Sequence, residues 1–267
     1  MQGTIKSLLV AGMLLAAPLQ AIAGDYWWSG DWYLKIGATG FVAPRYEGAK
    51  DYLLQGAPLV SVGREGSAVR FSSRNDNPSF ALIDNDMIRA GVVGKLVMPR
   101  DKDDSSDLKG LKRVKLGAEV GGFAEAYPTD WIRVRAEVRQ GIRSHSGIVA
   151  DLSADAFADL TETIRVSAGP RVSLATDDYM DAYYKVDAKH SARSGLKKFD
   201  PKGGLKSAGV GAEITWQATD RIEASAFTEY SRLLGDAADS SLVRERGSRN
   251  QFLFGVSSTY KFGFSLP

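Results

Sequence analysis

The chain of 267 residues contains no cysteine and only two histidines. The absence of cysteine excludes disulfides, thiol nucleophiles and zinc sites built from cysteine. The two histidines, His145 and His190, lie far apart in the sequence, and neither has carboxylates at a spacing typical of a metal site. We therefore expect no metal ion and no cofactor.

The chain also lacks an excess of charge of either sign. It has 34 Lys and Arg residues against 32 Asp and Glu residues, for a formal net charge of +2. Basic and acidic residues interleave along the sequence, so no basic face for nucleic acid is expected. The acidic run 101–107 is interpreted as a solvated loop, and loose cation binding there is the weaker alternative.

Long apolar runs are missing after the first 23 residues. Lys6 precedes an apolar stretch at 7–19, and the small residues of 21–23 end with Ala23. This arrangement is typical of a secretory signal peptide at 1–23, cleaved after Ala23. No later segment reaches 18 consecutive apolar residues, so no transmembrane helix is expected. A chain that leaves the cytoplasm without such a helix is periplasmic, secreted or a membrane β-barrel.

Strict alternation of apolar and polar residues is the main pattern of the mature chain. In the segment 131–142, Ile132, Val134 and Val138 share one face of an extended strand, and Arg133 and Arg135 share the other. A helix would scatter these arginines around its circumference. Many such segments exceed the usual strand length of about five or six residues and approach the roughly 9–11 residues of a membrane strand.

The connections between these segments alternate between short and long. The sequence predicts an all-β fold, a transmembrane antiparallel up-and-down β-barrel that spans residues 24–267. Short turns would face the periplasm and long loops the outside. The segments 68–74 and 79–83 are both short and could instead form one bent strand. About twelve strands are expected, at 31–42, 53–63, 68–74, 79–83, 87–98, 113–127, 131–142, 147–160, 163–175, 203–218, 220–233 and 251–264.

A soluble periplasmic sandwich or lipocalin-like barrel is the alternative, because alternation does not say which face lies inside. Strand length, loop asymmetry and the small residues of the apolar face favour the membrane barrel. Aromatic residues also lie near the expected strand ends, where a membrane barrel carries its aromatic girdles. We therefore expect contact with outer-membrane lipid and lipopolysaccharide.

Charged residues would then meet inside the barrel. A network of ion pairs is favoured over a selective pore, because unpaired buried charges are costly. The expected lumen charge network consists of Lys115, Glu119, Arg133, Arg135, Glu137, Arg139, Arg165, Arg171, Glu213, Arg221 and Glu223.

No catalytic constellation stands out. His145 and Ser146 are neighbours, as in some lipid hydrolases, but adjacent residues of an extended chain face opposite sides. We interpret them as part of a polar turn. The chain is therefore predicted to be a non-enzymatic protein with no catalytic residue.

Several strings in fixed order resemble the MipA/OmpV family of MltA-interacting outer-membrane proteins. They are APRYEGAKDY (43–52), LKGL (108–111), GIVADL (147–152), DDYMDAYYKV (177–186), SARSGLKKFD (191–200), LLGDAADSSLV (233–243) and YKF (260–262). The resemblance spans essentially the whole mature chain.

This resemblance implies an outer-membrane scaffold linked to peptidoglycan remodelling, with a murein lytic transglycosylase and a murein synthase as partners. The charged lumen leaves a second hypothesis, a small-solute channel or ligand-binding receptor that uses the large outer loops. Candidate residues of the loop surface are Tyr46, Tyr179, Met180, Tyr183, Ser194 and Asp236.

Overall fold

The computed structural model describes residues 29–64, 71–74, 76–85 and 87–266. The expected signal peptide at 1–23 lies outside these residues. The described part contains eleven strands: β1 (Gly30–Pro44), β2 (Tyr52–Arg64), β3 (Ser79–Asp84), β4 (Ile88–Val97), β5 (Gly117–Thr129), β6 (Ile132–Ile142), β7 (Ile148–Asp159), β8 (Ile164–Ala175), β9 (Gly204–Gln217), β10 (Ile222–Leu233) and β11 (Asn250–Leu266).

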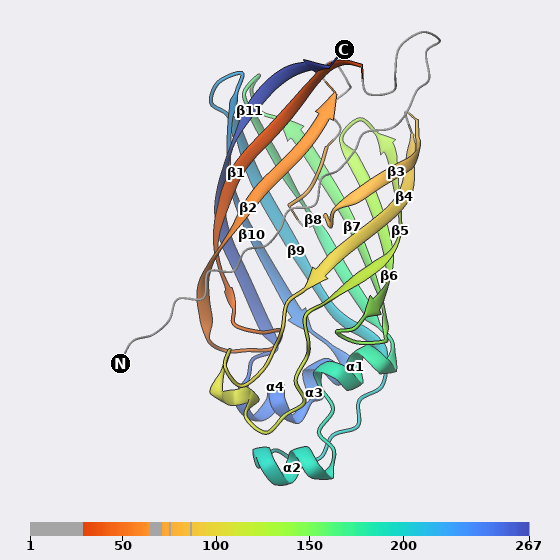
Figure 1. Ribbon diagram of the computed structural model, residues 1–267, viewed down its shortest axis with the longest axis vertical. Coiled ribbons are helices and arrows are strands. Elements are labelled where there is room, and N and C mark those ends of the chain that lie inside the picture. Colours follow the sequence, from red (N-terminus) through yellow and green to blue (C-terminus); the bar gives the residue numbers. More distant parts are fainter. Residues whose placement is uncertain (1–28, 65–70, 75, 86, 267) are drawn as a thin grey trace.

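The strands form one antiparallel, up-and-down sheet in which β3 to β11 follow each other in chain order. β1 pairs with β11 on one side and with β2 on the other. The sheet curls into a barrel around a central lumen, with β2 and β3 as its two outermost strands (Figure 1). Most strands have ten residues or more, long enough to cross a bilayer at a tilt.

The two faces of the sheet differ as the alternation predicts. On β6, Arg133 and Arg139 are fully buried on the inner face, whereas Val138 on the outer face is 53% exposed. Leu152, Val210 and Phe254 are likewise exposed on the outer faces of β7, β9 and β11. Apolar side chains therefore surround the barrel and charged ones lie inside it, which confirms a membrane barrel and excludes the soluble alternative.

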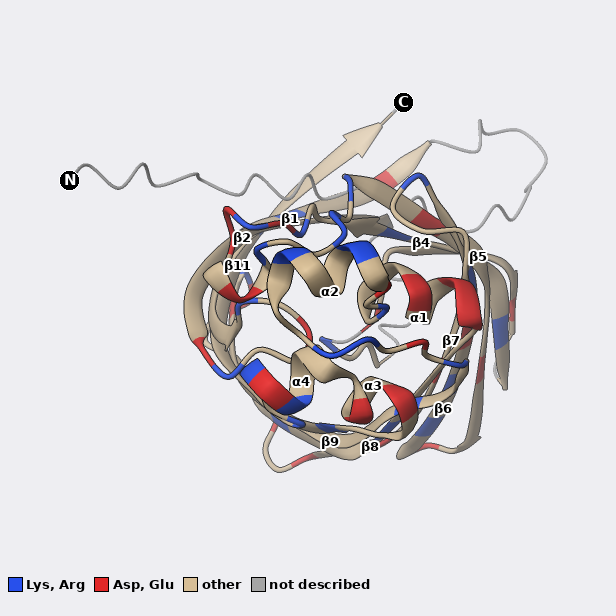
Figure 2. Ribbon diagram, turned by 90° about the horizontal axis from the view of Figure 1, so that it is seen from below, with Lys and Arg blue, Asp and Glu red and all other residues tan. Residues whose placement is uncertain are grey.

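The barrel has unequal ends (Figure 1). At one end the strands join through short turns. At the other, the loops 45–51, 98–116, 143–147, 176–203 and 234–249 gather over the barrel mouth, and we call this group the cap (Figure 2). The cap contains η1 (Ser106–Leu108), α1 (Asp177–Tyr183), α2 (Ala188–Ser194), α3 (Gly235–Asp239) and α4 (Ser241–Arg246). No helix in the described ranges is long and apolar enough to span a membrane.

One expected strand, 68–74, is wrong. Residues 68–70 lie outside the described ranges, and residues 71–74 form no strand. These residues, with 76 and 77, instead lie inside the barrel, and we call them the inner segment. The physical reason is their composition: FSSR followed by Asp76 and Asn77 has no apolar face to offer to lipid, but it offers polar groups to the charged lumen.

Candidate functional site

A dense group of buried charges lines one side of the lumen, on the inner faces of β5, β6 and β7. The register of β6 places Arg135 beside Glu125 on β5 and Arg133 beside Asp155 on β7. We call this group the ion-paired wall. Its members are Glu119, Glu125, Arg133, Arg135, Glu137, Arg139, Asp151 and Asp155.

Arg133 has the most enclosed position in this wall. Its side chain is 0% exposed, and its Nη2 donates to Asp155 Oδ2 at 2.7 Å and to Asp76 Oδ1 at 2.9 Å. Asp155 also accepts from Arg171 on β8. Removing one partner of a buried ion pair lowers the free energy of unfolding by about 3–5 kcal/mol, because the other charge is left buried and unpaired. The burial of each of these charged groups therefore depends on its partners.

Arg139 joins the centre of the wall to the cap end. Its guanidinium donates to Glu119 Oε2 at 2.9 Å and also to Glu137 and Asp151. Glu119 is shared with the buried His145, whose Nε2 lies 3.1 Å from Glu119 Oε1. The ring of His145 packs edge-on against Tyr179 of α1, so the wall and the cap form one continuous structure.

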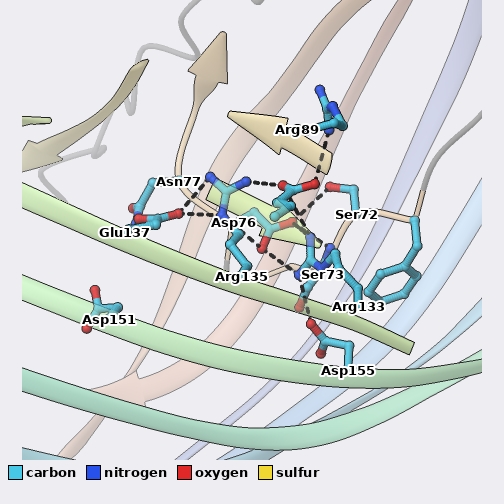
Figure 3. A network of polar contacts seen from close by, with 12 residues as sticks. Ser72, Ser73, Asp76, Asn77, Arg89, Arg133, Arg135, Glu137, Asp151 and Asp155 are labelled. Carbon is cyan, nitrogen blue, oxygen red and sulfur yellow. Dashed lines mark hydrogen bonds and ion pairs between the residues drawn. The ribbon is translucent and has the colours of Figure 1, made fainter. Parts of the chain in front are cut away.

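The inner segment rests against this wall, with Asp76 and Asn77 facing Arg133 and Glu137 (Figure 3). Asp76 binds Arg133 through two hydrogen bonds, and Asn77 donates to Glu137 at 2.7 Å. Phe71 stacks on Phe157 of β7 with ring centroids 4.5 Å apart. The segment therefore fills lumen space next to β6 and β7.

Arg74 carries the inner segment to the far side of the barrel. Its guanidinium lies 4.7 Å from the ring centroid of Phe227 on β10. Arg74 also lies with Glu213 around a cavity of only about 10 Å³. Contacts from β6 through to β10 mean that the inner segment spans the lumen from wall to wall.

Not every residue of the expected lumen network belongs to this group. Lys115 is exposed before β5, because the strand begins only at Gly117, and it contacts none of the buried charges. Arg165 is partly exposed, pairs with Asp159 at 2.6 Å and lies 5.8 Å from the ring centroid of Phe157. Arg221 is exposed at the short-turn end and donates to Tyr260. The assignments of Lys115 and Arg221 to the lumen are corrected, because both residues are exposed and precede the first residue of their strands. Arg165 lies within β8 at the short-turn end, where it pairs with Asp159 rather than with the ion-paired wall.

Of the remaining predicted members, Arg171 contacts the ion-paired wall through Asp155, whereas Glu213 and Glu223 lie on the other side of the barrel. Glu223 pairs with Lys35 at 3.0 Å, and both side chains are about a quarter to a third exposed, at 32% and 26%. Glu213 faces Arg74, as described above. Near the cap end of this side is a cavity of about 210 Å³, lined by Glu47, Glu229, Gln251 and their neighbours.

The cap is held together by two buried apolar clusters. One joins Tyr179 and Met180 to residues of α3 and α4, and the other joins Tyr46 to Leu108, Leu196 and other residues. Tyr46, Tyr179 and Met180 are only 6%, 5% and 2% exposed. Their assignment to the loop surface is therefore wrong, since the loops bury their large side chains against one another.

The other three loop candidates also make contacts within the cap. Tyr183 is half-buried and stacks on Tyr179, and the guanidinium of Arg100 lies 5.0 Å from its ring centroid. Ser194 donates to the carbonyl of His190 at 2.7 Å. Asp236 is partly exposed and accepts a hydrogen bond from the backbone N–H of Lys202.

Glu47 is a central polar residue of the cap that the sequence did not single out. It accepts hydrogen bonds from Tyr184 and from Lys206 Nζ, the latter at 2.8 Å. Burial alone would raise the pKa of Glu47, but attraction by Lys206 outweighs it and lowers that pKa below its ordinary value. Burial raises the pKa of Tyr183 to about 12, with a contribution from Glu47. Glu47 is therefore a fixed anion under the cap.

Asp76 and Asn77 were also missed. The sequence feature that could have identified them is the interruption of the apolar–polar alternation at 71–77, which a membrane-facing strand does not show.

No hydrolase pair forms at the predicted polar turn, since His145 is buried against Glu119 while Ser146 is exposed. Among the residues that the structure describes, no group of His, Asp and Glu is placed to hold a metal ion.

Comparisons with known proteins agree with this arrangement. A family model described as MltA-interacting protein MipA matches residues 36–262. Outer membrane protein Omp26La of Vibrio anguillarum is 25% identical over 262 residues, and outer membrane protein OmpV of Vibrio cholerae is 26% identical over 262 residues. Each alignment covers 97% of this chain and 97% of the relative.

Solved structures are more distant. Neisserial surface protein A is 10% identical with a TM-score of 0.27, over 86% of this chain and 97% of that one. The CymD monoaromatic hydrocarbon channel is 10% identical with a TM-score of 0.35, over 89% of each chain. Likeness at this level carries no argument about function.

Proposed function

Because this chain belongs to the family of the MltA-interacting protein MipA and is an outer-membrane β-barrel protein, we propose that it is a non-enzymatic, non-conducting scaffold. Its periplasmic end would dock a murein lytic transglycosylase and, through it, a murein synthase. The scaffold would hold these peptidoglycan-remodelling enzymes at the outer membrane.

The observation that carries this proposal is the filled lumen. The inner segment reaches from Arg133 on β6 to Phe227 on β10, and the cap lies over the outer mouth. A barrel built in this way is suited to presenting surfaces rather than to passing solutes. The absence of a nucleophile–base pair at His145 and Ser146 supports a non-enzymatic role.

The short-turn end offers apolar side chains to a partner. Met87, Trp131 and Leu160 lie in or next to three of the short turns and are 65%, 55% and 63% exposed. Exposed tryptophan and methionine are enriched at protein interfaces. We therefore place the docking surface on this rim, where the periplasm begins.

The cavity of about 210 Å³ near the cap end favours a second candidate, a receptor for a small solute. Its mouth would open toward the outside, next to Glu47. The filled lumen gives less support to the channel form of this hypothesis, because a solute would have to pass the inner segment.

Capture of the full-length, detergent-solubilised protein on an immobilised murein lytic transglycosylase would test the scaffold. We expect the wild type to be retained and the double variant Trp131→Ala, Leu160→Ala to bind about tenfold more weakly or worse, as loss of an interface hot spot implies. The matched control is Trp216→Ala, since Trp216 is 53% exposed but lies on the lipid-facing side of β9.

Heat-modifiable migration in gels should be unchanged in all variants, which separates docking from folding. No retention of the folded wild type would contradict the scaffold. Equal weakening by Trp216→Ala would contradict the placement of the surface on the rim.

A further inference from the structure

The outer surface of the cap is divided by charge. Figure 2 shows acidic residues on α1 and α3, and basic residues on α2, on α4 and in the neighbouring loops. The sequence contains two runs with four Lys or Arg residues each and no Asp or Glu, at 108–115 and 188–199. Both runs belong to the cap.

Packing brings these two runs together although 80 positions separate their beginnings. Leu108, Leu196 and Leu242 share one buried cluster, so the residues that follow them emerge side by side. Gly110 is so close to the backbone of Arg193 that an added Cβ would lie 2.7 Å from its carbonyl carbon. Arg246 fixes the junction by donating to the carbonyls of Asp107 and Ser194.

The cations at this junction are exposed and not neutralised. Elsewhere in the cap, Arg113 pairs with Asp101, Lys185 with Asp200, and Arg249 with Asp239. No ion pair within the described ranges involves the six residues that we call the basic surface: Lys109, Lys112, Arg193, Lys197, Lys198 and Arg244. Glu245 also lies here and accepts from the backbone of Lys197 at 3.4 Å.

We propose that the basic surface binds the phosphate-bearing core saccharide of lipopolysaccharide. The surface lies beyond the strand ends, outside the hydrocarbon layer, at the level where the sugars of the outer leaflet begin. Arginine and lysine are the side chains that bind phosphate groups, and several exposed cations near a polyanion act together. The acidic half of the cap would be left free of saccharide by like-charge repulsion.

Binding of soluble core oligosaccharide, released from lipopolysaccharide by mild acid, to the full-length protein in detergent tests the proposal. We expect wild-type affinity to fall as salt increases, because exposed ion pairs are screened. Replacing the six cations by glutamine should lower the affinity about tenfold or more. The matched control exchanges Lys for Arg and Arg for Lys at the same six positions and should bind like the wild type.

Removal of the phosphates from the oligosaccharide should lower the affinity as much as the glutamine variant does. Equal affinity of the glutamine variant and the wild type would overturn the proposal, as would equal binding of the dephosphorylated sugar. Binding of heparin without binding of the core oligosaccharide would also overturn it, since the surface would then recognise a foreign polyanion.

Discussion

The two sides of the lumen differ in how deeply their polar side chains are buried and in how these side chains are paired. The ion-paired wall of β5, β6 and β7 buries its charges almost completely, as the 0% exposure of Arg133 and Arg139 shows. The opposite side, formed by β1, β9, β10 and β11, presents the partly exposed pair of Lys35 and Glu223 and short hydroxyl side chains. The inner segment makes its ion pair with the first side, through Asp76 and Arg133, and reaches the second side only through Arg74.

This difference shows why the inner segment lies where it does. Strand-to-strand pairing leaves Arg133 between Asp155 and Glu125, with Glu125 Oε1 3.8 Å away and shared with Arg135. Asp76 completes the coordination of Arg133 by two hydrogen bonds. The hydroxyl-lined side needs no such partner, because Ser225 and Ser257 hydrogen-bond to each other and Lys35 pairs with Glu223.

The largest expected effect is the loss of Arg133. Arg133→Leu leaves Asp76 and Asp155 without a counter-ion, so we expect the free energy of unfolding to fall by about 3–5 kcal/mol. Lys35→Leu is the matched control on the other side and should cost less than about 1 kcal/mol. Urea unfolding in detergent, followed by tryptophan fluorescence, measures both. Equal losses for the two variants would remove the distinction between the two sides.

A smaller effect concerns Glu47, which links the cap to the lumen. The pKa of Glu47 is lowered in the folded protein. Its contribution to the free energy of unfolding is therefore fully present above its ordinary pKa and is lost as the pH falls through the lowered pKa. Glu47→Gln should therefore be less stable than the wild type by about 1–2 kcal/mol near neutral pH. The difference in stability between the two proteins should shrink as the pH falls below the ordinary pKa of a glutamate.

Thermal unfolding of the wild type and Glu47→Gln at a series of pH values shows whether the stability difference between them shrinks or grows as the pH falls. Comparing the two proteins at each pH cancels the titration of the other carboxylates. A difference that grows as the solution becomes more acidic would contradict the assignment of Glu47 as a fixed anion.

The smallest effect is expected on the hydroxyl-lined side. Ser225 and Ser257 share a hydrogen bond of 2.8 Å between β10 and β11. Ser225→Ala should lower the free energy of unfolding by about 1 kcal/mol, the usual net value of one hydrogen bond. Unfolding in urea under the same conditions gives the value, and a loss as large as that of Arg133→Leu would show that this side is equally dependent on buried polar contacts.

The sequence predicted the barrel because alternation is a local property of each strand. The arginines of β6 could be assigned to the lumen one strand at a time, and the register then joined Arg135 to Glu125. The inner segment could not be predicted in this way. Its place depends on Arg133 and Phe157, which lie far away in the sequence and become its neighbours only when the sheet curls into the barrel.

The packing of the cap at the candidate site also could not be predicted from single segments of the sequence. The sequence identified Tyr46, Tyr179 and Met180 as notable, but aromatic residues in a long loop are compatible with either a surface or a core. Their burial follows from the packing of five loops over one mouth, which no single loop encodes. Lys115 was misplaced for a related reason, because the alternation of β5 continues in the sequence before the strand begins.

The most direct test of a lumen closed by the inner segment is the electrical conductance of the wild-type protein in a planar lipid bilayer. We expect inserted barrels to be silent, because the contacts from Asp76 to Arg133 and from Arg74 to Phe227 hold the segment across the lumen. Steady, ohmic conductance steps from the purified wild type would contradict a closed lumen and favour a channel.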